Sequence, residues 1–173
     1  MLEFRCEKIG GSGMEQANGN LRDNSGAVIR PPIAWGLAVI AGVLLDRFHP
    51  LPFLPAGVPV GWLGGIVFLA GLALLLWAAT TFRRAGTQIQ TTEPTTTIVD
   101  AGPYRYTRNP MYIGMFLGLF GLAVAFDSLW LVVLLVPFYL VIRYGVVARE
   151  ERYLERKFGD AYLAYKARVR RWL

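Results

Sequence analysis

The stretch Gly102–Gly114, GPYRYTRNPMYIG, combines residue types that can bind a small charged molecule. Pro110 suits the first position of a helix and disfavours helical backbone at Asn109, so a helix is predicted to start here. The first N–H groups of a helix have no partner within it, and beside Arg108 they favour a carboxylate or phosphate. Three tyrosines add flat faces and hydroxyl donors that suit an adenine ring or a sulfonium cation. They are Tyr104, Tyr106 and Tyr112.

Arg and Tyr residues at the start of a membrane helix also have an explanation that involves no ligand. Positively charged residues gather at the cytoplasmic ends of such helices, and tyrosines gather at the membrane interface. Composition alone therefore leaves two interpretations of Gly102–Gly114 open. One is a binding site, and the other is a topology signal.

The acidic pair Glu150 and Glu151 forms a second polar group, after an apolar segment. Neighbours on a helix point about 100° apart, so the two carboxylates cannot both face one ligand squarely. We expect one of them to bind a ligand and the other to pair with an arginine. Arg143 lies seven residues before Glu150, on nearly the same helical face. A charge inside an apolar segment indicates either a functional residue or a side chain that extends to the headgroups.

The composition is that of a membrane protein, because 54% of the 173 residues are hydrophobic and only 17% are charged. The net charge of +6 is better explained by anionic lipid headgroups than by nucleic acid, for which no motif is present. Cys6 and His49 are the sole cysteine and histidine. A single cysteine excludes a disulfide framework, and with one cysteine and one histidine we expect no metal site.

Four apolar segments predict membrane helices. They are Ile33–Leu45, Val58–Phe82, Met111–Phe126 and Leu129–Val147. The first is shorter than the roughly 20 residues that cross a bilayer, and Asp46 and Arg47 interrupt its extension, so we expect a broken or shallow outer end. The second carries no charge and can span with a tilt. Its glycines offer small faces for close helix contact, and Gly61 and Gly65 fit the small-xxx-small spacing.

The last two apolar segments form a predicted tight antiparallel hairpin, in which Asp127 and Ser128 cap the second helix. Both polar groups therefore emerge on the same side of the membrane. Pro137 is expected to kink the second arm. Lys and Arg residues concentrate on the side that carries the polar groups, which predicts four helices with both termini in the cytoplasm.

The remaining polar segments flank these helices. Residues 1–30 lack an apolar period and are expected to be a disordered tail, with a linker-like Gly10–Gly13 and with Met14 as the natural start. Residues 31–173 then form one domain, whose core is residues 85–173. The long polar loop at 85–108 is a candidate lid.

The segment after Val147 is amphipathic, with a helix stop and cap expected at Gly159 and Asp160. Its apolar residues recur at spacings of three and four. They are Leu154, Phe158, Ala161, Tyr165, Val169 and Trp172. Such a tail either lies on the lipid headgroups or covers the site.

The order Arg108, Asn109, Pro110, x, Tyr112, x, Gly114, followed by a hydrophobic hairpin and a Glu-Glu pair, resembles the isoprenylcysteine carboxyl methyltransferase-like family. It is also similar to the phospholipid methyltransferases. The resemblance runs from about residue 87 to the end of the sequence. Asn109 departs from the eukaryotic pattern, which has His, and an amide cannot titrate near neutral pH. A binding role survives this replacement, whereas a general base at this position would be lost.

The resemblance implies an all-α integral membrane protein of about four transmembrane helices that binds S-adenosylmethionine. It further implies methyl transfer to a lipophilic or membrane-partitioned carboxylate, thiol or amine, in a bacterial inner membrane with the site facing the cytoplasm. The expected partners are lipids and this acceptor. Glu150 and Arg143 are the candidate catalytic residues. The candidate cofactor-binding residues are Tyr104, Tyr106, Arg108, Asn109, Pro110, Tyr112, Gly114, Glu150 and Glu151.

Two other functions are consistent with the same sequence. Some nicotinamide-dependent sterol-type reductases look similar in fold to this family, but their chains are generally much longer, and no second cofactor-binding motif is present here. A small membrane protein of the same fold without catalysis is the other alternative. Asn109 in place of His keeps that alternative open.

Overall fold

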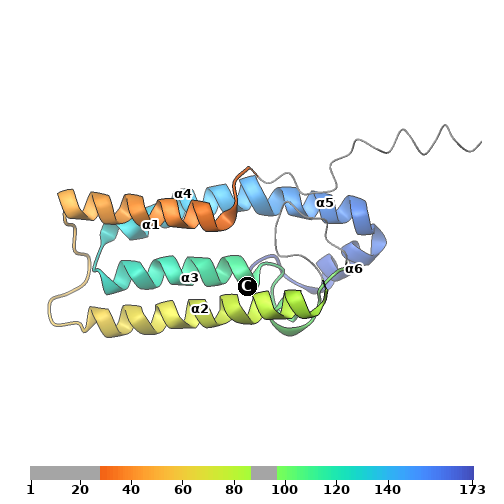
Figure 1. The fold of residues 1–173 in the computed structure, drawn as a ribbon, viewed down its shortest axis with the longest axis horizontal. Helices are drawn as coiled ribbons and strands as arrows, with labels where there is room; N and C mark the ends of the chain where they lie inside the picture. The colour runs from red at the N-terminus through yellow and green to blue at the C-terminus, as the bar shows by residue number, and fades with distance from the viewer. Residues whose placement is uncertain (1–27, 87–96) are drawn as a thin grey trace, which may run out of the picture.

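A computed structural model describes residues 28–86 and 97–173, and every named element among them is helical. Figure 1 shows α1 running beside α4 and α2 beside α3, with the tail helices α5 and α6 at one end of the bundle. The helices are α1 Pro31–Phe48, α2 Val60–Arg84, the 3-10 turn η1 Gly102–Arg105, α3 Pro110–Ala125, α4 Leu129–Leu140, the π-helical η2 Val141–Val147, α5 Ala148–Phe158 and α6 Asp160–Arg168.

Three helical stretches among the described residues are long and apolar enough to cross a membrane. They are α1, α2 and the continuous helix Leu129–Phe158. The α3 helix has 16 residues and is about 24 Å long, less than the roughly 30 Å of a bilayer core. The all-helical membrane fold is therefore confirmed, while a fourth span remains a prediction. The α1 helix runs unbroken past Asp46 and Arg47 and ends at Phe48.

Glycines bring α2 and α3 into backbone contact. A Cβ atom on Gly64 would lie 2.2 Å from the Ala125 nitrogen, and one on Gly71 would lie 2.7 Å from the Gly114 oxygen. Gly61 and Gly65 have open space around them. The small-xxx-small contact predicted for these two residues is therefore wrong. The glycines that pack are seven residues apart, which is two helical turns and keeps both on the face toward α3.

The turn between α3 and α4 is tight, as predicted, but its polar residues do not cap α4. Ser128 makes no side-chain cap bond, and its buried Oγ has no hydrogen-bond partner. The Asp127 carboxylate instead accepts hydrogen bonds from the backbone N–H groups of Phe53 and Leu54, both at 2.9 Å. Asp127 therefore fastens the loop between α1 and α2 to the hairpin tip.

The opposite end of the bundle positions the polar residues. The core of the hairpin, which includes Leu119, Leu131 and Ile142, holds α3 against α4 and η2. The amphipathic tail continues as α5, reverses at Gly159 with a positive φ of 52°, and returns as α6. The helix stop predicted at Gly159 is confirmed. Asp160 is the first residue of α6 and forms no side-chain cap, so the cap predicted there is wrong.

Candidate functional site

The segment before α3 is held against α2 by a buried turn. Gly102 has a φ of +55°, and a Cβ atom there would lie 2.8 Å from Thr81 Oγ1, so both backbone and space require glycine. Tyr104 is buried, and its ring centroid lies 5.6 Å from that of Phe82. This contact packs η1, the turn that precedes α3, against α2.

The last residues of the sequence fold back onto this segment. Thr107 forms a parallel β-bridge with Arg170, in which the Arg108 N–H donates to the Arg170 oxygen at 2.9 Å. The Arg171 carbonyl oxygen accepts from Thr107 Oγ1 at 3.2 Å and from Asn109 Nδ2 at 2.8 Å. We call Arg170–Leu173 the C-terminal strap. The strap thus covers residues 107–109, while the two roles considered for the tail and the side of the membrane on which it lies stay predictions.

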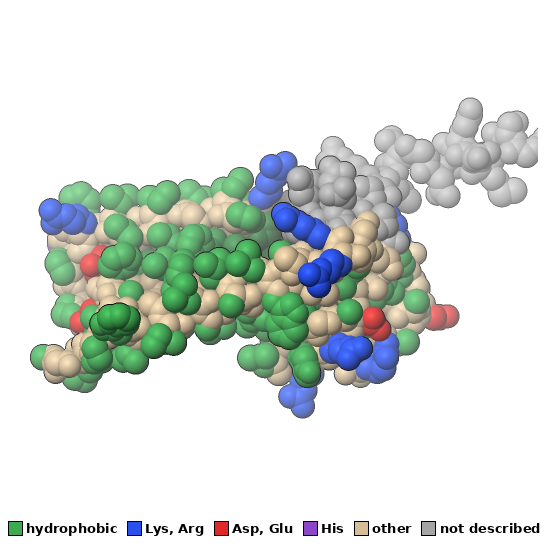
Figure 2. Space-filling view, turned by 60° about the horizontal axis from the view of Figure 1, so that its bottom comes forward, with side chains coloured by type: hydrophobic (Ala, Val, Ile, Leu, Met, Phe, Trp, Pro, Cys, Tyr) green, Lys and Arg blue, Asp and Glu red, His purple; other side chains and the backbone are tan. Residues whose placement is uncertain are grey.

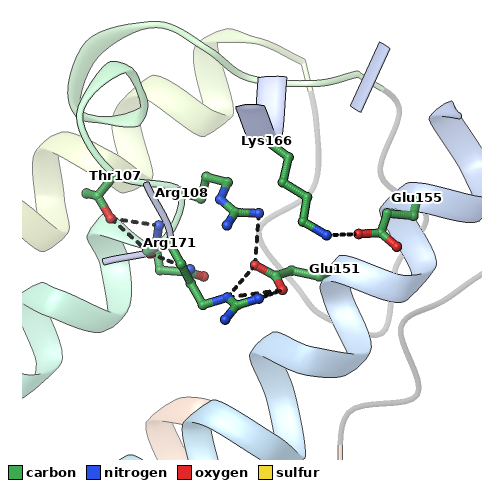
Figure 3. Close-up of polar contacts among 7 residues, drawn as sticks. Thr107, Arg108, Glu151, Glu155, Lys166 and Arg171 are labelled. Carbon is green, nitrogen blue, oxygen red and sulfur yellow. Dashed lines mark hydrogen bonds and ion pairs between the residues drawn. The ribbon is translucent and has the colours of Figure 1, made fainter. Parts of the chain in front are cut away.

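Glu151 joins the start of α3 to α5 through two arginines, as Figure 3 shows. Arg108 Nη1 lies 3.0 Å from Glu151 Oε1, and these side chains are only 9% and 10% exposed. Arg171 donates from Nε to Oε1 at 2.9 Å and from Nη2 to Oε2 at 2.8 Å. These hydrogen bonds to Glu151 raise the pKa of Arg171. The two polar groups predicted from the sequence therefore meet at one end of the molecule.

Glu150 has a different environment from its neighbour. The Tyr112 hydroxyl lies 2.8 Å and 3.0 Å from the two carboxylate oxygens of Glu150 and donates to that group. Among residues 28–86 and 97–173, no Arg or Lys forms an ion pair with Glu150. Glu150 is thus the member of the pair that has no arginine partner in the part of the chain that the structure describes.

Arg108, Tyr112, Glu150, Glu151 and Arg171 form a polar cluster, which Tyr104 completes. Its hydroxyl is buried and has no hydrogen-bond partner. Burial raises the pKa of Tyr104 above its usual value, with smaller contributions from Tyr165 and Glu150. The group is therefore a neutral phenol with a free donor. Arg108 Nε is also buried without a hydrogen-bond partner.

Arg143, Tyr106 and Gly114 lie outside this cluster. Arg143 is in η2, where its guanidinium lies 5.2 Å from the Tyr144 ring centroid, and it forms no ion pair among the described residues. Tyr106 is 71% exposed. Gly114 is buried against the α2 backbone, where its role is packing, while Pro110 is buried at the start of α3.

The structure also changes the helical geometry from which Arg143 and Glu150 were placed on one face. The seven-residue spacing puts two side chains on one face only in an α-helix, but residues 141–147 form a wider π-helix. The extra backbone carbonyls of a π-turn need partners, and the Gly145 oxygen accepts from the Val28 N–H at 3.2 Å. The helix continues through Pro137. The kink expected at that residue stays a prediction.

An apolar groove of about 420 Å³ lies between α3 and α4. Its lining residues are Ile113, Phe116, Leu117, Phe120, Leu135, Val136 and Tyr139. Tyr112, Phe116 and Phe120 are spaced by four, so they follow one face of α3 from the polar cluster into the groove. Trp172 lies at this junction, with its ring centroid 6.2 Å from that of Phe116 and 5.9 Å from that of Tyr139.

Sequence reasoning missed the individual roles of the C-terminal strap and of α6. Arg171 and Trp172 contact the site directly, and the Tyr165 hydroxyl donates to the backbone carbonyl oxygen of Tyr104 at 2.9 Å. The amphipathic spacing identified Tyr165 and Trp172 as buried-face residues without giving their partners. Arg171 had no signal of its own, because it is one of several basic residues in the tail. The lid proposed for residues 85–108 includes 87–96, and the tail at 1–30 includes 1–27, both outside the described residues.

Comparison with known proteins identifies one family. Residues 60–161 match the family model described as phospholipid methyltransferase, which is more than half of the chain and includes both Asn109 and Glu150. An uncharacterized protein of Haemophilus influenzae is 59% identical over 44 residues, which cover 25% of this chain and 67% of that relative. No solved structure matches the chain.

Proposed function

The chain belongs to the phospholipid methyltransferase family, and from this premise we propose that it transfers the methyl group of S-adenosylmethionine to a lipophilic or membrane-partitioned acceptor. The observation that carries the proposal is the meeting of two distant segments within the matched region. Tyr112 donates to Glu150 across 38 positions of sequence, and Arg108 lies 3.0 Å from Glu151. Family membership supports methyl transfer, and this cluster supports a site for the donor.

The chemistry of the cluster fits S-adenosylmethionine. That molecule carries an ammonium, a sulfonium, a carboxylate, ribose hydroxyls and a flat adenine. The Glu150 carboxylate can accept from the ammonium or the ribose, and the partnerless Arg108 Nε can donate to the carboxylate. The free Tyr104 hydroxyl and the Tyr112 ring provide a donor and an aromatic face. Tyr106 is exposed, so its proposed contact would depend on a rearrangement of the turn after η1.

The residues of this chain contribute mainly by positioning and by excluding water. When bound, S-adenosylmethionine supplies an electrophilic methyl group on a cationic sulfur. The methyl group goes to the acceptor, and the sulfur leaves as a neutral thioether. The strap covers the segment at 107–109, and Trp172 packs at the junction with the groove. Such an arrangement holds reacting groups together and keeps water out, which can lower the barrier substantially.

Acid-base chemistry depends on the acceptor. A carboxylate or thiolate acceptor is already ionised and needs no base from the protein. An amine acceptor must lose a proton, and Glu150 is the carboxylate best placed to accept it, because Glu151 is held by two arginines. Arg143 has no assigned step, since its guanidinium lies over Tyr144.

The groove between α3 and α4 supports a lipophilic acceptor. It is lined almost entirely by apolar side chains, and the face of α3 that lines it continues to Tyr112. An acceptor with an apolar portion in the groove would present its reactive end to the polar cluster. Carboxylate, thiol and amine acceptors each satisfy this arrangement.

We further propose that the protein lies in a bacterial inner membrane with this site toward the cytoplasm. Figure 2 shows apolar side chains along the helices and most of the basic side chains at one end. Arg83, Arg84 and Arg105 belong to this end, together with the basic residues of the tail. Such an excess of Lys and Arg is typical of the cytoplasmic side.

Calorimetry of the detergent-purified full chain tests the proposal. We expect S-adenosylmethionine to bind the wild type, and Glu150→Gln to weaken binding at least tenfold. Asp160→Asn is the matched control, because it removes the same charge from an exposed residue of α6. Incubation with methyl-labelled cofactor and total membrane extract should then place the label in a lipid fraction. Absence of S-adenosylmethionine binding by folded wild type would refute the proposal.

One observation favours a second candidate, a non-catalytic membrane protein of the same fold. The Asn109 amide donates to the Arg171 carbonyl and so makes a contact within the protein. A side chain in this position can serve folding alone. Folded wild type that binds no nucleotide would support this candidate, and preferential binding of NADPH would instead support a reductase.

A further inference from the structure

Arg171 contacts α5 with its side chain and the segment before α3 with its backbone. Its guanidinium donates to both oxygens of Glu151 on α5. Its carbonyl oxygen accepts from the side chains of Thr107 and Asn109, in the segment before α3. Residue 171 therefore ties together two regions that both lie within the family match, while residue 171 itself lies outside the matched residues 60–161.

We propose that Arg171 is a positioning residue of the site, which holds Glu151 so that Glu150 is the carboxylate left to bind a cationic group of the methyl donor. The inference rests on the proposed function and assigns a role to a residue beyond the family match. Arg171 acts through Glu151 and does not itself contact the ligand.

Glu151 depends on Arg171 for its orientation. Arg108 contributes an ion pair at 3.0 Å, but its Nη1 is not aligned for a hydrogen bond to the carboxylate. Within the part of the chain that the structure describes, all hydrogen bonds to the Glu151 carboxylate come from Arg171. A bidentate guanidinium fixes both the position and the plane of a carboxylate, whereas a single ion pair leaves it free to rotate.

The charges of the cluster explain why this orientation matters. Glu150 and Glu151 are adjacent carboxyl groups, and Arg108 and Arg171 both lie on Glu151. Without Arg171, Arg108 is the cation that the structure leaves on Glu151, and it could turn toward the neighbouring Glu150. Such an ion pair would compete with binding of a ligand ammonium, because opposite charges in a partly buried site attract strongly.

The backbone of the strap is held independently of the Arg171 side chain. The Arg170 oxygen accepts from the Arg108 N–H, and the Trp172 ring packs against Phe116 and Tyr139. Replacement of the guanidinium leaves these contacts in place. We therefore expect side-chain variants at position 171 to fold with the strap docked.

The test compares Arg171→Ala and Arg171→Lys with Arg170→Ala in the full-length protein. Arg170 is exposed and its side chain has no partner among the described residues, so its variant removes the same charge from the next position. Calorimetry should show S-adenosylmethionine binding weakened at least tenfold by Arg171→Ala and less by Arg171→Lys. Arg170→Ala should stay within about twofold of wild type, a difference of at most about 0.4 kcal/mol.

Rescue separates positioning from a general loss of stability. Millimolar guanidinium, too dilute to denature, should restore S-adenosylmethionine binding to Arg171→Ala and leave Arg170→Ala unchanged. Labelled methyl transfer should fall mainly through a raised KM for the cofactor. If Arg171→Ala does not fold, Arg171→Lys carries the same comparison without rescue.

Three outcomes decide the inference. Equal binding by wild type and folded Arg171→Ala would overturn it and leave the proposed function intact. A lower melting temperature with unchanged binding would assign Arg171 to stability alone and would also overturn it. Failure of the wild type to bind S-adenosylmethionine would overturn the inference and the proposed function together.

Discussion

The Tyr112 hydroxyl donates to the Glu150 carboxylate, with 2.8 Å and 3.0 Å to the two oxygens, and so joins the first turn of α3 to the first turn of α5. This contact differs from the one that its neighbour Glu151 makes with two arginines. Two carboxylates adjacent in sequence thus have separate roles. Glu151 ties the C-terminal strap and the segment before α3 to α5, and under the proposed function Glu150 is the carboxylate that binds the ligand.

Tyr112→Phe should weaken binding of S-adenosylmethionine about tenfold, because it removes the hydroxyl that orients Glu150. A tenfold loss of affinity corresponds to about 1.4 kcal/mol of binding free energy. Calorimetry in detergent measures the effect. Tyr144→Phe is the matched control, since Tyr144 is 62% exposed and loses the same hydroxyl. Equal affinities for the two variants would show that Glu150 does not depend on Tyr112.

Glu151→Gln should lower the free energy of unfolding by about 3 kcal/mol, because it leaves two arginines without their counter-charge in a mostly buried position. The control is Glu155→Gln, which breaks the ion pair with Lys166. That pair is about one third exposed, at 33% and 35%, so its loss should cost less than about 1 kcal/mol. Thermal unfolding in detergent measures both changes, and similar losses would contradict the assignment.

Gly64→Ala should destabilise the protein strongly, because the new Cβ would lie 2.2 Å from the Ala125 nitrogen and push α3 away from α2. Gly65→Ala places the same methyl group in open space and should be neutral or stabilising by up to about 1 kcal/mol. The melting temperatures of the two variants provide the measurement. A stable Gly64→Ala protein would mean that α2 and α3 do not make this contact.

The stability of the folded tail should decrease at alkaline pH because of Tyr162. Burial, followed by the charge of Glu151, raises the pKa of Tyr162 to about 12, despite the opposing effect of Arg108. The folded state therefore holds this proton more tightly than the unfolded state, whose phenol has a pKa of about 10. The contribution of the Tyr162 phenol to the free energy of unfolding is complete below pH 10 and is lost as pH rises toward 12. Unfolding between pH 9 and 12 should depend less on pH in Tyr162→Phe, and an unchanged slope would contradict this origin.

Much of the architecture could be predicted from local sequence signals. Apolar runs gave the helices, and Pro110 and Gly159 marked a helix start and a helix stop in the places where the structure has them. These signals work because backbone restrictions act within a few residues. The meeting of Arg108 with Glu151 followed from the shortness of the hairpin turn.

The features that could not be predicted depend on long-range packing. Nothing local marks residues 141–147 as a π-helix, so the α-helical geometry assumed for the spacing between Arg143 and Glu150 does not hold there. The choice of Gly64 over Gly65 for the contact with α3 is set by the rotation of α2. Arg171 lies 20 residues from its partner Glu151, and only the reversal at Gly159 brings them together.

Replacement of Asn109 tests whether the amide serves as a hydrogen-bond donor. Asn109 Nδ2 donates to the Arg171 carbonyl at 2.8 Å, and a neutral imidazole N–H can do the same. Asn109→His should therefore retain the strap contact and bind S-adenosylmethionine within about threefold of wild type, or within about 0.7 kcal/mol. Asn109→Asp replaces the donor with a carboxylate that faces a carbonyl oxygen, so it should weaken binding at least tenfold. Susceptibility of the C-terminal residues to carboxypeptidase should rise only in the aspartate variant. Strong binding and a protected strap in Asn109→Asp would show that the cluster does not need this donor.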